Sequence, residues 1–333
     1  LNRALQDENA FVRLSAAEAL RNQSTLPESI LIAFSRLLQD ENVNVRLSTA
    51  IALGGQPSLP ESTLLALNRS LQDVDDNVRL LTAYALRVQS KLPESTLIAL
   101  NRALQDENND VKKSAAIALI KQSALPESTL LALNRSLQDV NDDVRVFAVH
   151  ALGMQPRLPE STLIALNRAF QDENVNVRIS VVDALGKQST LLESTLIAIS
   201  RALQDENVFI RMKAAVILGE QSILPKLAHL GLNSALRDED AYVRRLAAGA
   251  FGNQSKLSKS SLLTLKVALQ DEDVNVRRSA AFALGEQPKL PESVLLALVD
   301  ELQYKNIDDQ ESVLMVLDRH VESILMLQDK QKI

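Results

Sequence analysis

The sequence predicts an all-α fold in which a pair of helices is repeated along the chain. Three observations predict it. Gln-Asp recurs in a register of 33 residues, at 6–7, 39–40, 72–73, 105–106, 138–139, 171–172, 204–205 and 270–271, and Arg237-Asp238 fills the gap. Leu-Pro-Glu-Ser begins at residues 26, 59, 92, 125, 158 and 290 in the same register. No segment alternates apolar and polar residues with the period of a strand. A fixed period of this length is typical of a solenoid, whose units pack on their neighbours.

The unit from residue 92 to residue 124 shows why each repeat is expected to hold two helices. Pro93 suits the first turn of a helix, where its missing N–H costs nothing. Asn108 is a good N-cap for a second helix. Apolar residues follow each start at helical spacing. They are Leu97, Leu100 and Leu104 in the first helix, and Val111, Ala115, Ala118 and Leu119 in the second.

The same register defines the domain organisation. We expect about ten repeats, with an array over residues 1–289 in which residues 1–25 are a partial first repeat. The last unit has Tyr304 in place of the turn Asp, and its second helix carries Val313, Leu314, Val316 and Leu317. A terminal repeat must cover an exposed core face, so residues 290–333 are predicted to be a degenerate C-terminal cap and tail. Because the array starts within a first helix, we expect further sequence upstream.

Composition excludes several classes of site. The chain has no cysteine, which excludes disulfides and thiolate chemistry and fits a cytoplasmic location. No stretch reaches the roughly 18 apolar residues of a membrane helix, so we expect no membrane association. Lys and Arg number 36 against 42 Asp and Glu, a net charge of −6. This balance makes nucleic acid an improbable partner, since a duplex binder needs a continuous basic footprint.

The segment 269–285, Leu-Gln-Asp-Glu-Asp-Val-Asn-Val-Arg-Arg-Ser-Ala-Ala-Phe-Ala-Leu-Gly, resembles HEAT repeats, most of all the short variety named after phycobilin lyases. The resemblance covers nearly the whole chain. It implies a right-handed α-α superhelix of helix-turn-helix repeats whose second helices line a concave face. It does not imply one function, because this fold occurs in scaffolds, receptors, sensor arrays and a few enzymes.

Residues that recur in every unit are expected to be structural. A turn Asp and a second-helix Arg or Lys repeat together, and either their mutual contact or an i, i+4 pair such as Arg36 with Asp40 would explain them. Gln at the end of each unit is expected to cap the loop between units. The repeated residues include Asp40, Asp73, Asp106, Asp139, Arg13, Arg46, Arg79, Lys112, Gln23, Gln56 and Gln89.

The functional prediction comes from positions that vary between units. On each second helix, positions spaced i, i+3, i+7 and i+11 form one stripe opposite the core residues. Within this stripe and beside it, we predict a protein-binding surface. Its residues are Phe11, Leu14, Glu18, Leu47, Ile51, Leu80, Tyr84, Lys113, Ile117, Phe147, His150, Met154, Asp183, Phe209, Met212, Tyr242, Arg245, Arg278 and Phe282.

Two interpretations of this stripe compete. In the first, residues at exposed positions drift without functional cause, and this drift alone would make the stripe differ between units. Against drift, the Asn-Arg pair of the first helix (Asn68-Arg69, Asn101-Arg102) hardly changes although it lies outside the predicted core. Half of the ten Phe and Tyr residues lie on the stripe, and exposed aromatic residues are enriched at interfaces. We therefore favour binding, while self-packing of neighbouring units over the stripe stays open.

Catalytic and metal sites are not predicted. The histidines His150, His229 and His320 lack the second His or carboxylate at ligand spacing that a metal site needs. There is no glycine-rich phosphate loop and no Gly-x-Ser-x-Gly elbow. We expect no enzyme activity, no cofactor and no metal.

The favoured hypothesis is thus a scaffold whose second-helix stripe binds a protein or an extended peptide. A groove along such an array is on the order of 90 Å long, from about 9–10 Å per packed helix layer, and is too long for a small molecule. The alternative is a sensor segment of a larger regulatory protein, such as a nucleotide-regulated receptor. A lower alternative is an enzyme or chaperone like the phycobilin lyases.

Overall fold

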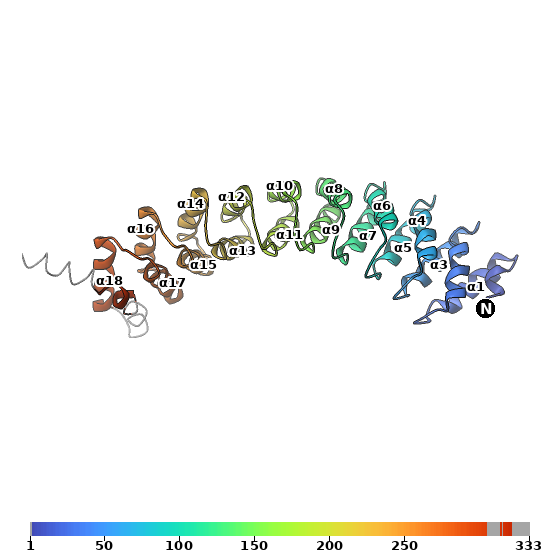
Figure 1. The fold of residues 1–333 in the computed structure, drawn as a ribbon, viewed down its shortest axis with the longest axis horizontal. Helices are drawn as coiled ribbons and strands as arrows, with labels where there is room; N and C mark the ends of the chain where they lie inside the picture. Colours follow the sequence, from blue (N-terminus) through green and yellow to red (C-terminus); the bar gives the residue numbers. More distant parts are fainter. Residues whose placement is uncertain (1, 305–313, 315, 322–333) are drawn as a thin grey trace, which may run out of the picture. The chain divides into compact units, whose positions relative to one another are not determined.

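The computed structural model describes residues 2–304, 314 and 316–321 (Figure 1), and every regular element within them is a helix. After a short 3-10 helix, η1 (Ala4–Gln6), each repeat contributes a first helix and a second helix. The first helices are α2 (Glu28–Leu37), α4 (Glu61–Ser70), α6 (Glu94–Ala103), α8 (Glu127–Ser136), α10 (Glu160–Ala169), α12 (Glu193–Ala202), α14 (Lys226–Ala235), α16 (Lys259–Ala268) and α18 (Glu292–Tyr304). The second helices are α1 (Ala10–Leu20), α3 (Val43–Gly54), α5 (Asp76–Leu86), α7 (Asn109–Ile120), α9 (Asp142–Gly153), α11 (Val175–Gly186), α13 (Val208–Gly219), α15 (Ala241–Gly252) and α17 (Val274–Gly285).

The chain forms two compact units, residues 1–188 and 189–333. In each unit the first helices form one layer and the second helices form another (Figure 1). Successive helices of a layer pack on each other, as in a helical solenoid, which confirms the predicted fold class. The right-handed sense of the superhelix stays a prediction.

The residues around each helix start explain the alternation. Asn108 caps α7, its side chain accepting hydrogen bonds from the backbone N–H groups of Asp110 and Val111, as predicted. Pro93 lies at the N-cap of α6, with φ −67° and ψ 158°, rather than in the first turn. The prediction was wrong by one position, because the extended backbone angles of Pro93 set the direction of the chain before the first helical residue.

The apolar positions predicted for residues 92–124 form the core. Leu100 is fully buried and Leu97 nearly so, and on α7 Val111 and Leu119 are fully buried. Small residues on the second helices let that layer pack closely. A Cβ placed on Gly153 would lie 3.0 Å from the Cα of Ala184 in α11, so the backbones of α9 and α11 nearly touch there. Consecutive second helices contact each other more extensively than consecutive first helices do.

The predicted C-terminal cap is described only in part. Val316 is buried and packs against Gly285 at the end of α17, as expected of a segment that covers the last repeat. Residues 305–313, 315 and 322–333 of the predicted cap lie outside the described residues. The domain boundary at residue 290 therefore stays a prediction.

Candidate protein-binding surface

Residues that recur in every repeat form a ladder of ion pairs between repeats. In one rung, Arg79 of α5 donates from Nε to Asp106 at 2.8 Å and from Nη2 at 3.0 Å. Its Nη1 donates to the backbone carbonyl of Asp73, 2.9 Å away, in its own turn. Other rungs are Arg13–Asp40, Arg46–Asp73, Lys112–Asp139, Arg145–Asp172, Arg211–Asp238 and Arg244–Asp271. These charges hold the repeats together and are not free to bind a ligand.

The repeated Asp does not form the i, i+4 ion pair with an Arg of its own first helix, which was one of the two alternatives that the sequence left open. Asp40 pairs with Arg13, which lies 27 residues earlier, rather than with Arg36 at i−4. Burial by itself would raise the pKa of Asp40, but hydrogen bonds from Arg13 and from the Asn42 N–H outweigh it and lower the pKa. The prediction that the repeated charges are structural is confirmed, and the contact joins adjacent repeats.

The repeated glutamines form a second ladder. Gln89 accepts a hydrogen bond from the Leu59 N–H at 3.0 Å and donates to the Gln56 carbonyl at 2.9 Å. Each glutamine thus satisfies backbone groups in the loop of the preceding repeat, which confirms the predicted cap. In the second unit Gln221 departs from this pattern and donates to the Ile217 carbonyl of its own helix.

One argument for binding is weakened by the structure. The constant Asn of the first helix is half-buried, and Asn101 Nδ2 donates to Thr129 Oγ1 of the next repeat at 3.0 Å. Asn134 makes the same contact with Thr162. This Asn is therefore constant because it makes a structural contact. Its constancy does not argue against random variation at exposed positions. The neighbouring Arg102 is exposed, so only the Arg of the pair still supports the argument.

The structure leaves every predicted stripe residue accessible. On α1 to α11 of the first unit, the exposed residues are Phe11, Glu18, Tyr84, His150 and Met154, and the half-buried ones are Leu14, Leu47, Ile51, Leu80, Lys113, Ile117, Phe147 and Asp183. On α13 to α17 of the second unit, Phe209, Tyr242, Arg278 and Phe282 are exposed, and Met212 and Arg245 are half-buried. Within a unit, side chains of neighbouring repeats thus bury part of the stripe but leave each of its residues at least partly exposed to solvent.

Three of the exposed aromatic residues lie beside cations, a feature that the sequence prediction did not include. The guanidinium of Arg87 lies 3.9 Å from the ring centroid of Tyr84. In the second unit, Lys213 Nζ lies 5.3 Å from the centroid of Phe209, and Arg245 lies 5.2 Å from that of Tyr242. The signal was the helical spacing of three or four residues from aromatic to cation. A cation at this distance is attracted to the face of the ring and helps to hold the ring in place.

His150 and His229 contact neighbouring side chains. His150 is exposed on the stripe, with Nε2 3.1 Å from Ser180 Oγ and its ring edge-on to Phe147. Partial burial, followed by the charge of Lys187, lowers the pKa of His150. His229 stacks on Phe251, with ring centroids 5.9 Å apart. Among the described residues no group of three His, Asp or Glu side chains is placed to hold a metal, and no described helix is long and apolar enough to cross a membrane.

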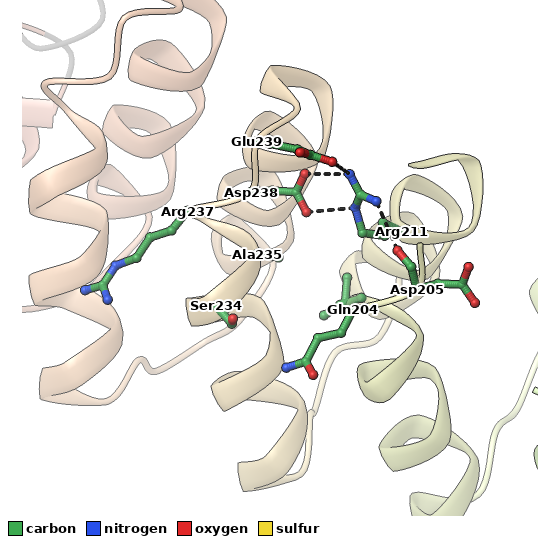
Figure 2. A pocket seen from close by; sticks show the side chains of 9 residues that line it. Gln204, Asp205, Arg211, Ser234, Ala235, Arg237, Asp238 and Glu239 are labelled. Atoms are coloured by element: carbon green, nitrogen blue, oxygen red, sulfur yellow. Dashed lines mark hydrogen bonds and ion pairs between the residues drawn. The ribbon is translucent and has the colours of Figure 1, made fainter. Parts of the chain in front are cut away.

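A hollow of about 330 Å³ lies at the turns between α12–α13 and α14–α15 (Figure 2). Here Ser234 and Arg237 stand where most repeats have Arg and Gln. Figure 2 shows Arg211 between Asp238, Glu239 and the backbone of Asp205, so these charges belong to one rung of the ladder, and Arg237 points away from them. The short side chain of Ser234 in place of Arg leaves space on this side of the turn.

Paired helices, stacked in register and joined by repeated ladders, define the class as a helical repeat protein. A family model for HEAT repeats matches residues 30–121, 128–219 and 230–317. The chain belongs to the HEAT-repeat family. The comparison with curated proteins gave no match. A crystal structure of an engineered protein from the Northeast Structural Genomics Consortium is similar over 96% of this chain and 97% of that one, with a TM-score of 0.61 and 20% identity. That likeness concerns the fold alone.

Proposed function

We propose that this protein is a binding scaffold that holds a protein or an extended peptide along the second-helix stripe. The observation that carries the proposal is the contrast within each repeat. Ladder and core residues stay constant, whereas the accessible stripe offers Ile51, Tyr84, Ile117 and His150 at one and the same position of successive repeats. An array that presents a different side chain at each step suits recognition of an extended partner.

The packing of each unit supports placing the stripe on an inner face. Second helices pack more closely together than first helices do. When one layer of a stack is more tightly spaced than the other, the stack bends toward the tighter layer. The stripe of each unit would then line the concave side, where side chains from several repeats converge on one partner.

The exposed aromatic residues are the expected anchors. Tyr84 is 44% exposed, Tyr242 60% and Phe282 54%. Tyrosine and arginine are over-represented among the few residues that contribute most of the binding energy at interfaces. The sensor-segment and lyase-like alternatives stay predictions, and no feature of the described residues favours them over a scaffold.

The test compares a stripe variant with a control variant that loses exposed apolar side chains elsewhere. The stripe variant combines Tyr84→Ser, Phe209→Ser, Tyr242→Ser and Phe282→Ser. The control combines Val74→Ser, Val140→Ser and Ile223→Ser, which are 95%, 90% and 81% exposed in loops away from the stripe. Both are immobilised after circular dichroism has confirmed folding, and proteins retained from a lysate of the source cells are quantified by mass spectrometry.

Proteins retained by the wild type and by the control, but reduced at least tenfold on the stripe variant, would support the proposal and identify the partner. Equal retention on all three chains, or no specific retention on the wild type, would contradict it.

A further inference from the structure

The outer face of the first helices carries a second repeated pattern. In the first unit, each first helix has an exposed Glu in its first turn, an exposed Ile or Leu four residues later, and an exposed Arg four residues after that. These positions lie on one slanted stripe of the helix. They are Glu28, Ile32 and Arg36 on α2; Glu61, Leu65 and Arg69 on α4; Glu94, Ile98 and Arg102 on α6; Glu127, Leu131 and Arg135 on α8; and Glu160, Ile164 and Arg168 on α10. We call this set the outer face.

The repeat structure itself does not explain the outer face. The helix dipole favours Glu in the first turn and Arg in the last, but it gives no reason for the aliphatic residue between them. Ile32, Leu65 and Ile98 are 42%, 42% and 44% exposed. Recent duplication does not explain it either, because exposed positions of the second helices differ from repeat to repeat over the same residues.

None of these Glu and Arg side chains forms an ion pair with another residue in the part of the chain that the structure describes. Along one helix, Glu94 and Arg102 are separated by eight residues, or roughly 12 Å of helix rise, which is too far for an ion pair. The outer face thus consists of three parallel rows that run across α2 to α10: an acidic row, an aliphatic row and a basic row.

From this arrangement we propose that the outer face docks a second copy of this chain. A two-fold axis along the line of repeats lays the aliphatic row of one copy on that of the other. It also places each acidic row opposite the basic row of its partner, so the surface is self-complementary, as an isologous dimer requires. A two-fold axis parallel to the helices would set acid against acid and is disfavoured. The repeats of the two copies also lie in register along this axis, because both copies have the same spacing between repeats.

The contact is centred on α4, α6 and α8. On the curvature proposed above, in which each unit bends toward its more closely packed second helices, two copies that meet through their first helices touch best at the middle of the unit. A stable interface uses about 20–30 residues a side. The outer face has three residues on each of five helices, which is fewer. The dimer is therefore expected to be weak and to respond to salt, because its charged rows stay close to solvent. The second-helix stripes of both copies remain free.

The test is charge complementation, followed by sedimentation velocity over a concentration series. One variant is Arg69→Glu, Arg102→Glu and Arg135→Glu, and the other is Glu61→Arg, Glu94→Arg and Glu127→Arg. Each variant alone should associate at least tenfold more weakly than the wild type, because like charges then face each other. An equimolar mixture should form a heterodimer at least as strong as the wild-type dimer.

The aliphatic row has its own variant and a matched control. Leu65→Ser, Ile98→Ser and Leu131→Ser together should abolish self-association, whereas Ile51→Ser, Tyr84→Ser and Ile117→Ser on the second helices should leave it unchanged. Thermal melts show that each chain is folded. A wild-type chain that stays monomeric up to its solubility limit overturns the proposal and leaves this face to a different partner. Self-association of both charge variants with wild-type strength overturns it as well.

Discussion

His229 shows how a single residue can depart from the repeat and alter its energetics. It lies on α14 at the position where Leu163, Leu196 and Leu262 pack in other repeats. Its ring stacks on Phe251, but Nδ1 is buried without a hydrogen-bond partner. Burial lowers the pKa of His229 from its ordinary value of 6.5. A neutral imidazole with an unsatisfied nitrogen is less stable in this place than leucine.

His229→Leu should therefore stabilise the second unit, by about 1 kcal/mol at pH 8. The gain should grow as the pH falls from 7 to 5, since the unfolded chain takes up a proton near 6.5 and the folded chain resists it. Asp40 and Asp271, whose pKa values are lowered, lose their contribution only below about 3.8, outside this range. Urea unfolding at pH 8 and pH 5 measures both effects.

The matched control is Leu163→His, which should introduce the same penalty in the first unit. Parallel pH profiles for wild type and His229→Leu would show that this ring is not the origin of the acid sensitivity.

The rung at Lys112 gives a second prediction at this scale, in which a substitution adds polar contacts instead of removing an unsatisfied polar group. Lys112 contacts Asp139 through one atom, Nζ to Oδ2 at 2.7 Å. Arginine rungs add a second bond to the carboxylate and a bond to a backbone carbonyl, as Arg79 does. Lys112→Arg should stabilise the chain by about 1 kcal/mol. Lys113→Arg is the control, because Lys113 pairs with Asp110 of its own helix and, at a longer distance, with Asp143 of the next repeat, and both carboxylates are largely exposed to solvent. Chemical denaturation compares the two, and equal midpoints would contradict the expectation.

At the scale of the element, two first helices of the second unit lack the preceding proline and have Leu192 or Ser258 in its place. Leu192 precedes α12 with φ −71° and ψ 154°, close to the φ −68° and ψ 159° of Pro159 before α10. Leu192→Pro should raise stability by about 0.4–1 kcal/mol, because proline restricts the unfolded chain at an angle the folded chain already adopts. The thermal midpoint measures it, with Leu191→Pro as a control that should destabilise. A lower midpoint for Leu192→Pro would reveal strain at this position.

Helices and their buried faces were predictable from the sequence, because apolar spacing such as Val111, Ala115 and Leu119 depends only on helix geometry. The contacts between repeats were not. Asp40 has Arg36 and Arg46 close in sequence, yet its carboxylate binds Arg13 and Arg46 reaches only its backbone carbonyl, a choice that the stacking of repeats decides. The contact of Asn101 is not predictable from the sequence for the same reason. Helix geometry places this residue outside the core of its own repeat, whereas the next repeat lies against it.

The same helix geometry predicts that the stripe residues are accessible, and the structure leaves them so. That the stripe binds a partner stays a prediction. The outer face was missed, although its Glu, Ile or Leu, and Arg recur every 33 residues. Constancy alone suggested a structural role for all repeated residues. Exposure, which only the structure supplies, separates repeated residues that hold repeats together from repeated residues that face solvent.

At the scale of the whole molecule, the ladders make stability a local property. Gln89 links adjacent repeats, and among the described helices of each unit every extensive contact joins a repeat to its neighbour along the stack. Such a chain approximates a one-dimensional sum of repeat and interface terms. A lesion in one ladder should therefore loosen the repeats on either side of it and leave distant repeats unaffected.

Gln89→Ala tests this directly. It leaves two buried backbone groups, the Leu59 N–H and the Gln56 carbonyl, without their partner, at a cost of about 1–3 kcal/mol each. Hydrogen exchange followed by mass spectrometry should show faster exchange in the loop at Leu59 and in α4 and α5, with no change in α13, α15 and α17. Ser90→Ala, at the exposed neighbouring position, should leave every segment unchanged. Faster exchange throughout the chain in Gln89→Ala would instead mean that the repeats unfold as one cooperative body, and the local description of their stability would have to be abandoned.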